Sequence, residues 1–104
     1  MRVFKALFSR SIRLTDERFE HFVSDHPELE NQDSKIQETL LSPDRIVRSR
    51  TNAEVELFYK FYASTPVTQK YLCIVTKVEE TDAFILTTYF TDTVKKGEIL
   101  WQKK

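Results

Sequence analysis

The chain has 104 residues, and its 16 Lys and Arg residues balance 16 Asp and Glu residues, so the net charge is zero. This length fits one domain over residues 1–104 and excludes a two-domain enzyme with a separate cofactor module. Zero net charge argues against binding nucleic acid through overall electrostatic attraction. The single glycine excludes Gly-rich phosphate loops and dinucleotide fingerprints, and the single cysteine can form neither an internal disulfide nor a zinc framework. We therefore expect no cofactor.

The apolar runs are too short for a membrane protein, because a spanning helix needs about 18 consecutive apolar residues. The opening run Val3–Phe8 is interrupted by Lys5 and is followed by no small-residue cleavage site, so it does not resemble a signal peptide. Cys73 stands between Leu72 and Ile74, which is typical of a buried hydrophobic residue in a reducing compartment. We expect a cytoplasmic protein that does not interact with membranes.

The N-terminal part predicts one or two short strands within residues 2–14, followed by two helices. Thr15 offers a side-chain oxygen as the cap of the first helix, whose apolar face has the i, i+3, i+4, i+7 spacing of Phe19, Phe22, Val23 and His26. Pro27 disfavours helical geometry at the residue before it, so this helix should end near His26. The second helix is expected over Asp33–Leu41, closed by Ser42 and Pro43. The acidic residues concentrated in this part indicate either an acidic helical layer or simply a solvated face.

From Arg45 onward, β-branched and aromatic residues predict strands over Arg45–Arg50, Val55–Ala63, Lys70–Glu79 and Ala83–Val94. Short turns separate these strands, and short connections join antiparallel neighbours. We predict an α+β fold in which two N-terminal helices pack on one face of an antiparallel meander of about four strands, with room for a short N-terminal strand. Gly97 marks the last turn, and Ile99–Trp101 could add an edge strand or pack over the sheet.

The two histidines are poor joint metal ligands, because a separation of five residues on a helix turns them about 140° apart. We predict no metal site. No serine stands in a Gly-x-Ser-x-Gly elbow, so a serine-hydrolase triad is also unsupported.

The remaining polar residues suit cleavage of RNA without a metal. RNA carries its own nucleophile, the 2′-hydroxyl, so the protein needs only a general base, a general acid and cations for the phosphate. The candidate catalytic residues are His21, His26, Arg48, Arg50 and Thr87. The candidate RNA-binding residues are Lys60, Tyr62, Lys77, Tyr89 and Thr91. Thr87, Tyr89 and Thr91 share one parity of the last expected strand, opposite Phe84, Leu86 and Phe90, and should face away from the helices.

Each candidate has an ordinary structural explanation as well. His26 lies on the apolar face near the end of the first helix, where packing or capping is the commoner use, and His21 lies on the solvated side. Alternating Arg and Lys residues most often keep an outer strand face soluble.

Three stretches together resemble a known family. They are Leu14–Phe22 (LTDERFEHF), His26-Pro27-Glu28, and Glu38–Ile46 (ETLLSPDRI), followed by Lys70–Lys77 and Phe84–Phe90 (FILTTYF). This order resembles the phage-associated branch of the barnase–EndoU–colicin–RelE-like nucleases, where "T-x-E-R-x-x-H-I … H-P-E" precedes "L-x-x-P-D-x-I".

The resemblance implies metal-independent RNA cleavage by a toxin or a translation-coupled ribonuclease, with an antitoxin or immunity protein as a further partner. By position it assigns catalytic roles to His21, His26, Arg48 or Arg50, and Thr87. Phe22 departs from the aliphatic residue of the family pattern.

The leading expectation is therefore a ribonuclease-like domain that acts on RNA as a monomer or homodimer. The first alternative is a non-catalytic module of the same fold that binds RNA or a protein through the exposed strand face. The second alternative is a structural domain whose aromatic residues serve an oligomer interface.

Overall fold

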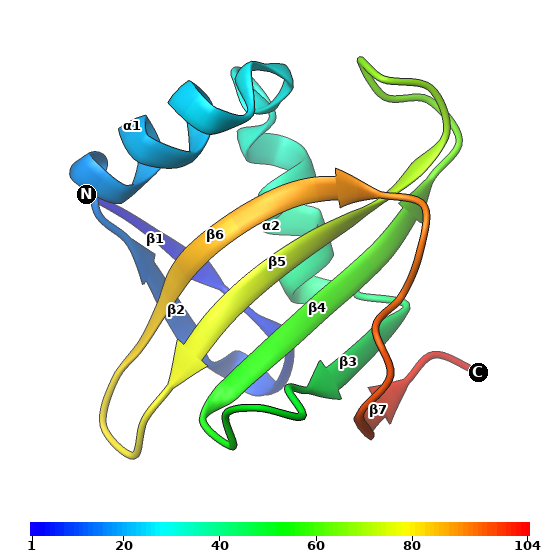
Figure 1. Cartoon of the computed structure of the whole chain (residues 1–104). Helices are drawn as coiled ribbons and strands as arrows, with labels where there is room; N and C mark the ends of the chain where they lie inside the picture. Colours follow the sequence, from blue (N-terminus) through cyan, green and yellow to red (C-terminus); the bar gives the residue numbers. More distant parts are fainter.

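The computed structural model describes residues 1–104, which form one mixed sheet and two α-helices (Figure 1). The elements in chain order are β1 (Arg2–Lys5), β2 (Ser11–Leu14), α1 (Asp16–Asp25), α2 (Asp33–Leu41), β3 (Arg45–Arg48), β4 (Val55–Tyr62), β5 (Lys70–Val78), β6 (Ala83–Thr91) and β7 (Glu98–Gln102). Short 3-10 turns occupy Leu7–Ser9 and Pro27–Leu29. Neither helix is long and apolar enough to span a membrane.

Both helices lie where the sequence places them, because their end signals are local. The Thr15 hydroxyl accepts a hydrogen bond from the Arg18 amide at 3.2 Å, which caps α1. At the other end the His26 amide still bonds the Phe22 carbonyl, and Pro27 then begins a separate 3-10 turn. α2 covers the predicted range Asp33–Leu41.

The predicted four-stranded antiparallel meander is wrong, because the sheet has seven strands in the order β1-β2-β6-β5-β4-β3-β7. The N-terminal residues form a hairpin, β1–β2, and β2 joins β6 in a parallel pairing that brings Arg13 opposite Phe84. β7 pairs with β3, so the C-terminal residues close the other edge. The β2–β6 and β3–β7 pairings each join segments far apart in sequence, and the local sequence pattern predicts neither partner.

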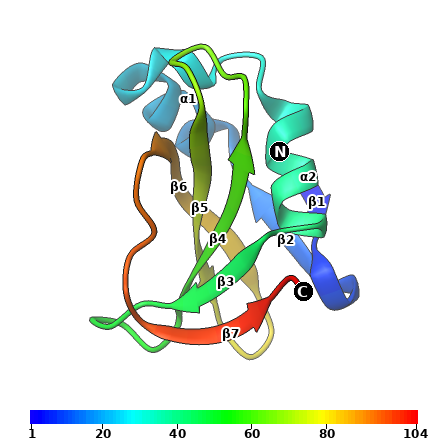
Figure 2. The same cartoon turned by 90° about the vertical axis from the view of Figure 1, so that its right-hand side faces the viewer.

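Each face of the sheet carries its own apolar cluster. We call the side covered by the helices the inner face; its cluster combines residues such as Phe22 of α1 and Ile36 of α2 with Phe58 and Ile74 of the sheet. The opposite side, the outer face, carries a smaller cluster built from Val47, Val55, Leu57, Tyr59 and Cys73. Figure 2 shows α2 on one side of the sheet and the connection from β6 to β7 on the other.

A bulge in β6 changes the predicted alternation of that strand. Val75 pairs with Thr87 and Thr76 pairs with Ile85, so Leu86 has no partner in β5. The extra residue turns Leu86 to the outer face with Thr87, whereas Ile85 enters the inner cluster. The expectation that the helices would cover Leu86 is therefore wrong.

Candidate functional site

The floor of the site is the outer face of the three long strands. Direct cross-strand partners share a face of a sheet. Leu57, Val75 and Thr87 therefore form one row across β4, β5 and β6, and Tyr59, Cys73 and Tyr89 form the next row.

The β6–β7 connection, residues 92–97, crosses this floor, contacts it at two points and approaches β3 closely at a third. Val94 packs into the outer cluster, and the Lys95 amide donates a hydrogen bond to the Tyr59 hydroxyl at 3.1 Å. Gly97 lies so close to β3 that a Cβ there would be 2.3 Å from the Arg48 carbonyl oxygen. The only glycine of the chain therefore stands where the connection must approach another backbone.

A basic groove of about 560 Å³ lies between this connection, the β3–β4 loop and the floor. Arg50 enters it from the loop, Lys95 and Lys96 from the connection, and Thr87 and Tyr89 from β6. No acidic residue lines the groove, and its three cationic side chains take part in none of the ion pairs of the chain. Three uncompensated positive charges over apolar and aromatic side chains suit an anionic ligand that also carries rings.

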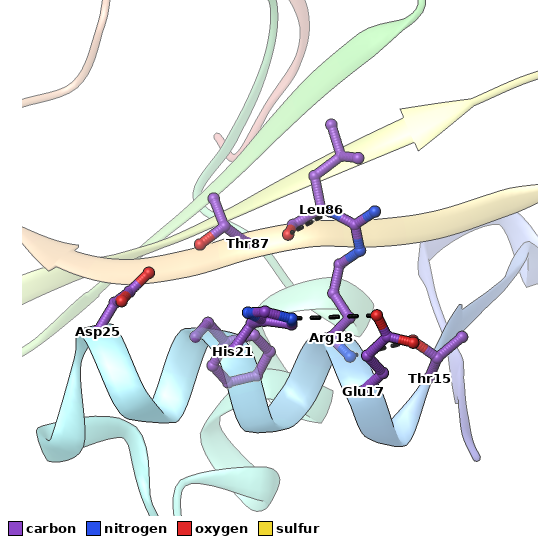
Figure 3. A pocket seen from close by; sticks show the side chains of 8 residues that line it. Thr15, Glu17, Arg18, His21, Asp25, Leu86 and Thr87 are labelled. Carbon is purple, nitrogen blue, oxygen red and sulfur yellow. Dashed lines mark hydrogen bonds and ion pairs between the residues drawn. The ribbon is translucent and has the colours of Figure 1, made fainter.

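Another cavity, which we call the α1–β6 pocket, adjoins the groove and has a volume of about 490 Å³ (Figure 3). His21, Asp25 and Arg18 approach it from α1, while Thr87 faces them from β6. The Arg18 guanidinium donates to the Leu86 carbonyl at 3.2 Å. This bond ties α1 to the bulge of β6, where the carbonyl has no partner residue in β5.

Leu86 and Thr87 line both cavities. The bulge places these two consecutive residues between the imidazole of His21 on one side and the basic groove on the other. The pocket and the groove therefore adjoin at Leu86 and Thr87.

His26 lies near Tyr89, which belongs to the second of the outer-face rows. Its ring centroid lies 6.3 Å from that of Tyr89, and its Nδ1 lies 3.5 Å from a carboxylate oxygen of Glu28. The side chain of His21 is 77% exposed, with Nε2 4.0 Å from the carboxylate of Glu17. Each histidine thus has a carboxylate neighbour and approaches one residue of β6.

The tyrosines of the site are neutral hydroxyls. Burial raises the pKa of Tyr89 well above its ordinary value, and the neighbouring Cys73 raises it further. Burial also raises the pKa of Tyr59 and that of the Cys73 thiol. Near neutral pH the Tyr89 hydroxyl can donate or accept a hydrogen bond, but it cannot act as a phenolate base.

Five of the residues singled out from sequence lie in or beside these two adjoining cavities. His21 lines the pocket, Arg50 and Tyr89 line the groove, Thr87 lines both, and His26 lies near Tyr89. The other five lie elsewhere. Arg48 faces the inner side of β3, pairs with Glu98 at 3.0 Å and donates to the Ala53 carbonyl. The expectation that Arg48 and Arg50 share a strand face fails because β3 ends at Arg48 and Arg50 stands in the loop.

Lys60 and Tyr62 lie on the helix-covered inner face. Lys60 Nζ donates to the Ser42 carbonyl at 2.9 Å, and the Tyr62 hydroxyl bonds the α2 residue Glu38 at 2.7 Å. Lys77 is on the outer face, but it pairs with Glu54 at 3.3 Å. The Thr91 hydroxyl forms hydrogen bonds with the backbone amide and carbonyl of Thr93 and so stabilises the turn that follows β6.

Sequence reasoning missed Lys95 and Lys96, which supply two of the three cations of the groove. The available signal was their position as a Lys-Lys pair immediately before the only glycine. It also missed Arg18, whose bond to Leu86 depends on a bulge that the strand pattern does not reveal.

Neither protein-family models nor curated proteins nor solved structures give a match to this chain.

Proposed function

We propose that this domain is a metal-independent endoribonuclease that binds RNA along the basic groove and cleaves it beside Thr87. The observation that carries the proposal is the junction at Thr87, where the pocket containing His21 meets the groove containing Arg50, Lys95 and Lys96. Proton-transfer groups thereby stand next to phosphate-binding cations, which is the combination that RNA cleavage needs. The resemblance of the LTDERFEHF, HPE and FILTTYF segments to the RelE-like nucleases supports the same reaction and a cytoplasmic place for it.

In the proposed reaction the 2′-oxygen of RNA attacks the adjacent phosphorus atom. A bond forms between phosphorus and O2′, and the bond between phosphorus and O5′ breaks. A base takes the proton of the 2′-hydroxyl and an acid gives a proton to the leaving O5′, so the products are a 2′,3′-cyclic phosphate and a 5′-hydroxyl. Arg50 and the two lysines stabilise the extra negative charge on the phosphate.

His21 and His26 are the proposed proton-transfer pair. They approach Thr87 and Tyr89, which are successive outer-face residues of β6 and therefore lie about 7 Å apart along the strand. One histidine serves as the base and the other as the acid, and each has a carboxylate neighbour, Glu17 beside His21 and Glu28 beside His26. The neutral hydroxyls of Thr87 and Tyr89 orient the phosphate.

The test is incubation with a short RNA in excess chelator, followed by analysis of the ends. We expect 2′,3′-cyclic ends, and no cleavage at a position where the RNA carries a 2′-deoxy sugar. His21→Gln and His26→Gln should each lower the rate by about 10²- to 10⁴-fold, as the loss of a proton-transfer group does. Arg50→Gln should weaken both binding and turnover.

The matched control is Lys5→Gln, which removes one charge from β1 at the opposite edge of the sheet. It should leave cleavage unchanged. Cleavage that survives both histidine substitutions, or products with 3′-hydroxyl ends, would contradict the mechanism. Binding of RNA without any cleavage would instead favour the non-catalytic RNA-binding module.

A further inference from the structure

The outer face carries a second cationic and aromatic cavity, on the far side of the β6–β7 connection. It has a volume of about 290 Å³ and is lined by Arg45, Tyr59, Tyr71, Lys103 and Lys104, among others. None of its three cationic side chains takes part in an ion pair of the chain. None of these five residues is among the candidate site residues expected from sequence.

The one acidic residue at this cavity is already engaged. Asp44 accepts a hydrogen bond from the Phe61 amide at 2.8 Å and lies 3.9 Å from the ammonium group of Lys60. Its negative charge is therefore compensated from within the chain, and the cavity keeps an excess of positive charge.

The cavity has an aromatic wall as well as charge. The ring of Tyr71 meets that of Tyr59 edge-on at 6.4 Å and that of Phe61 at 5.3 Å, and Phe61 is 45% exposed. The backbone near the C-terminus is fixed beside this wall, because the Lys103 amide donates to the Asp44 carbonyl at 2.9 Å. Aromatic side chains next to cations suit the unstacked bases and the backbone of a single strand.

The second cavity and the basic groove are neighbours. Tyr59 contributes to the second cavity, and its hydroxyl binds the amide of Lys95, whose side chain lines the groove. Val94 faces the second cavity, and the next two residues face the groove. A strand bound in the groove therefore needs only to pass over residues 94–96 to reach Tyr71.

We propose that this cavity is a second RNA subsite, which holds nucleotides beyond the cleaved bond. The preferred ligand is then a single-stranded RNA that is long enough to cross the β6–β7 connection. The proposal rests on the proposed function for its ligand class. It places phosphates against Arg45, Lys103 and Lys104, and a base against Tyr71.

The experiment compares the binding of fluorescein-labelled uridine oligomers of about 3 and about 12 nucleotides by fluorescence anisotropy, in chelator and with 2′-O-methyl riboses to prevent cleavage. Lys103→Gln combined with Lys104→Gln should weaken binding of the long oligomer about tenfold and leave the short one unchanged. Tyr71→Leu should do the same through loss of stacking, at unchanged charge. The charge-matched control, Lys5→Gln with Lys35→Gln, should change neither affinity.

Three results would overturn the proposal, and they are distinguishable. If the unaltered chain binds the long oligomer but neither Tyr71→Leu nor the double lysine variant weakens it, the second subsite is wrong and the RNA-binding groove stands. If both oligomers lose affinity equally, the lysines act only through general charge. If the unaltered chain binds neither oligomer, the proposed function fails together with the subsite.

Discussion

Arg13 is the residue at which the N-terminal hairpin is attached to the rest of the sheet. Its guanidinium makes hydrogen bonds to both carboxylate oxygens of Asp82, the shortest at 2.8 Å, and lies 4.9 Å from the centre of the Phe84 ring. The backbone contributes little here, because β2 and β6 share a single paired position, Arg13 opposite Phe84. Side-chain contacts of one arginine therefore reinforce the shortest junction of the sheet.

This pair predicts a pH-dependent contribution to stability. Hydrogen bonding to Arg13 lowers the pKa of Asp82 below its ordinary value. A carboxyl with a lowered folded-state pKa stabilises the fold above its unfolded pKa, and this contribution is lost as the pH falls through the folded pKa. Asp82→Asn should therefore lower the melting temperature at pH 7, and the difference from the unaltered chain should narrow as the pH falls below the ordinary pKa of a carboxyl. Thermal melts followed by circular dichroism at a series of pH values measure it, and a difference that does not shrink toward acid pH would contradict the explanation.

Among the elements, the β6–β7 connection determines the shape of the candidate site. It supplies Lys95 and Lys96 to the groove and separates the groove from the second cavity. Its path depends on the hydrogen bond to Tyr59 and on the close approach of Gly97 to β3. Displacement of this segment would move two of the three groove cations together.

We predict that Gly97→Ala both destabilises the chain and weakens RNA binding. An added Cβ would lie 2.3 Å from the Arg48 carbonyl oxygen and 2.8 Å from a methyl group of Val47, so the backbone must shift. Overpacking of this kind costs about 1–3 kcal/mol, which urea denaturation can measure. Lys96→Ala in the same segment should leave the free energy of unfolding unchanged while weakening RNA binding. Unchanged stability of Gly97→Ala would show that the connection is not constrained at this point.

At the scale of the whole molecule, the net charge is zero but the charged side chains are unevenly distributed over the surface. Most cationic side chains on the inner face and at the strand ends are paired, as Lys60 is with Asp44 and Arg48 with Glu98. The outer face instead gathers six cations outside any ion pair, and they are Arg45, Arg50, Lys95, Lys96, Lys103 and Lys104. The local field over this face, rather than the total charge, therefore governs attraction to a polyanion.

The salt dependence of RNA binding should reflect this arrangement. For single strands, log K falls with log salt concentration by about 0.7 for each phosphate neutralised. A long oligomer that contacts all six cations should give a slope of about −4, whereas a short oligomer held only in the groove should give about −2. Titrations at several salt concentrations measure both values. A slope near zero for both oligomers would contradict electrostatic binding at this face.

The sequence alone determined the features that depend on neighbouring residues. The cap at Thr15, the stop at Pro27 and the apolar stripe of Asp33–Leu41 specify both helices, because a helix is made of contacts within four residues. Alternation also indicated the outward direction of Thr87, Tyr89 and Thr91, since side chains alternate along a strand.

Only the tertiary structure decided the partners of β2 and β7, the inner position of Lys60 and Tyr62, and the bulge at Leu86. Each of these depends on which distant segment comes alongside, and single-residue patterns do not encode that choice. The candidate site is of this second kind, because its residues come from a helix, a loop and a bulged strand: His21 lines the pocket, Arg50 lines the groove and Thr87 lines both. Residue types led to the proposed chemistry, and packing across the sheet determined which of those residues line the two cavities.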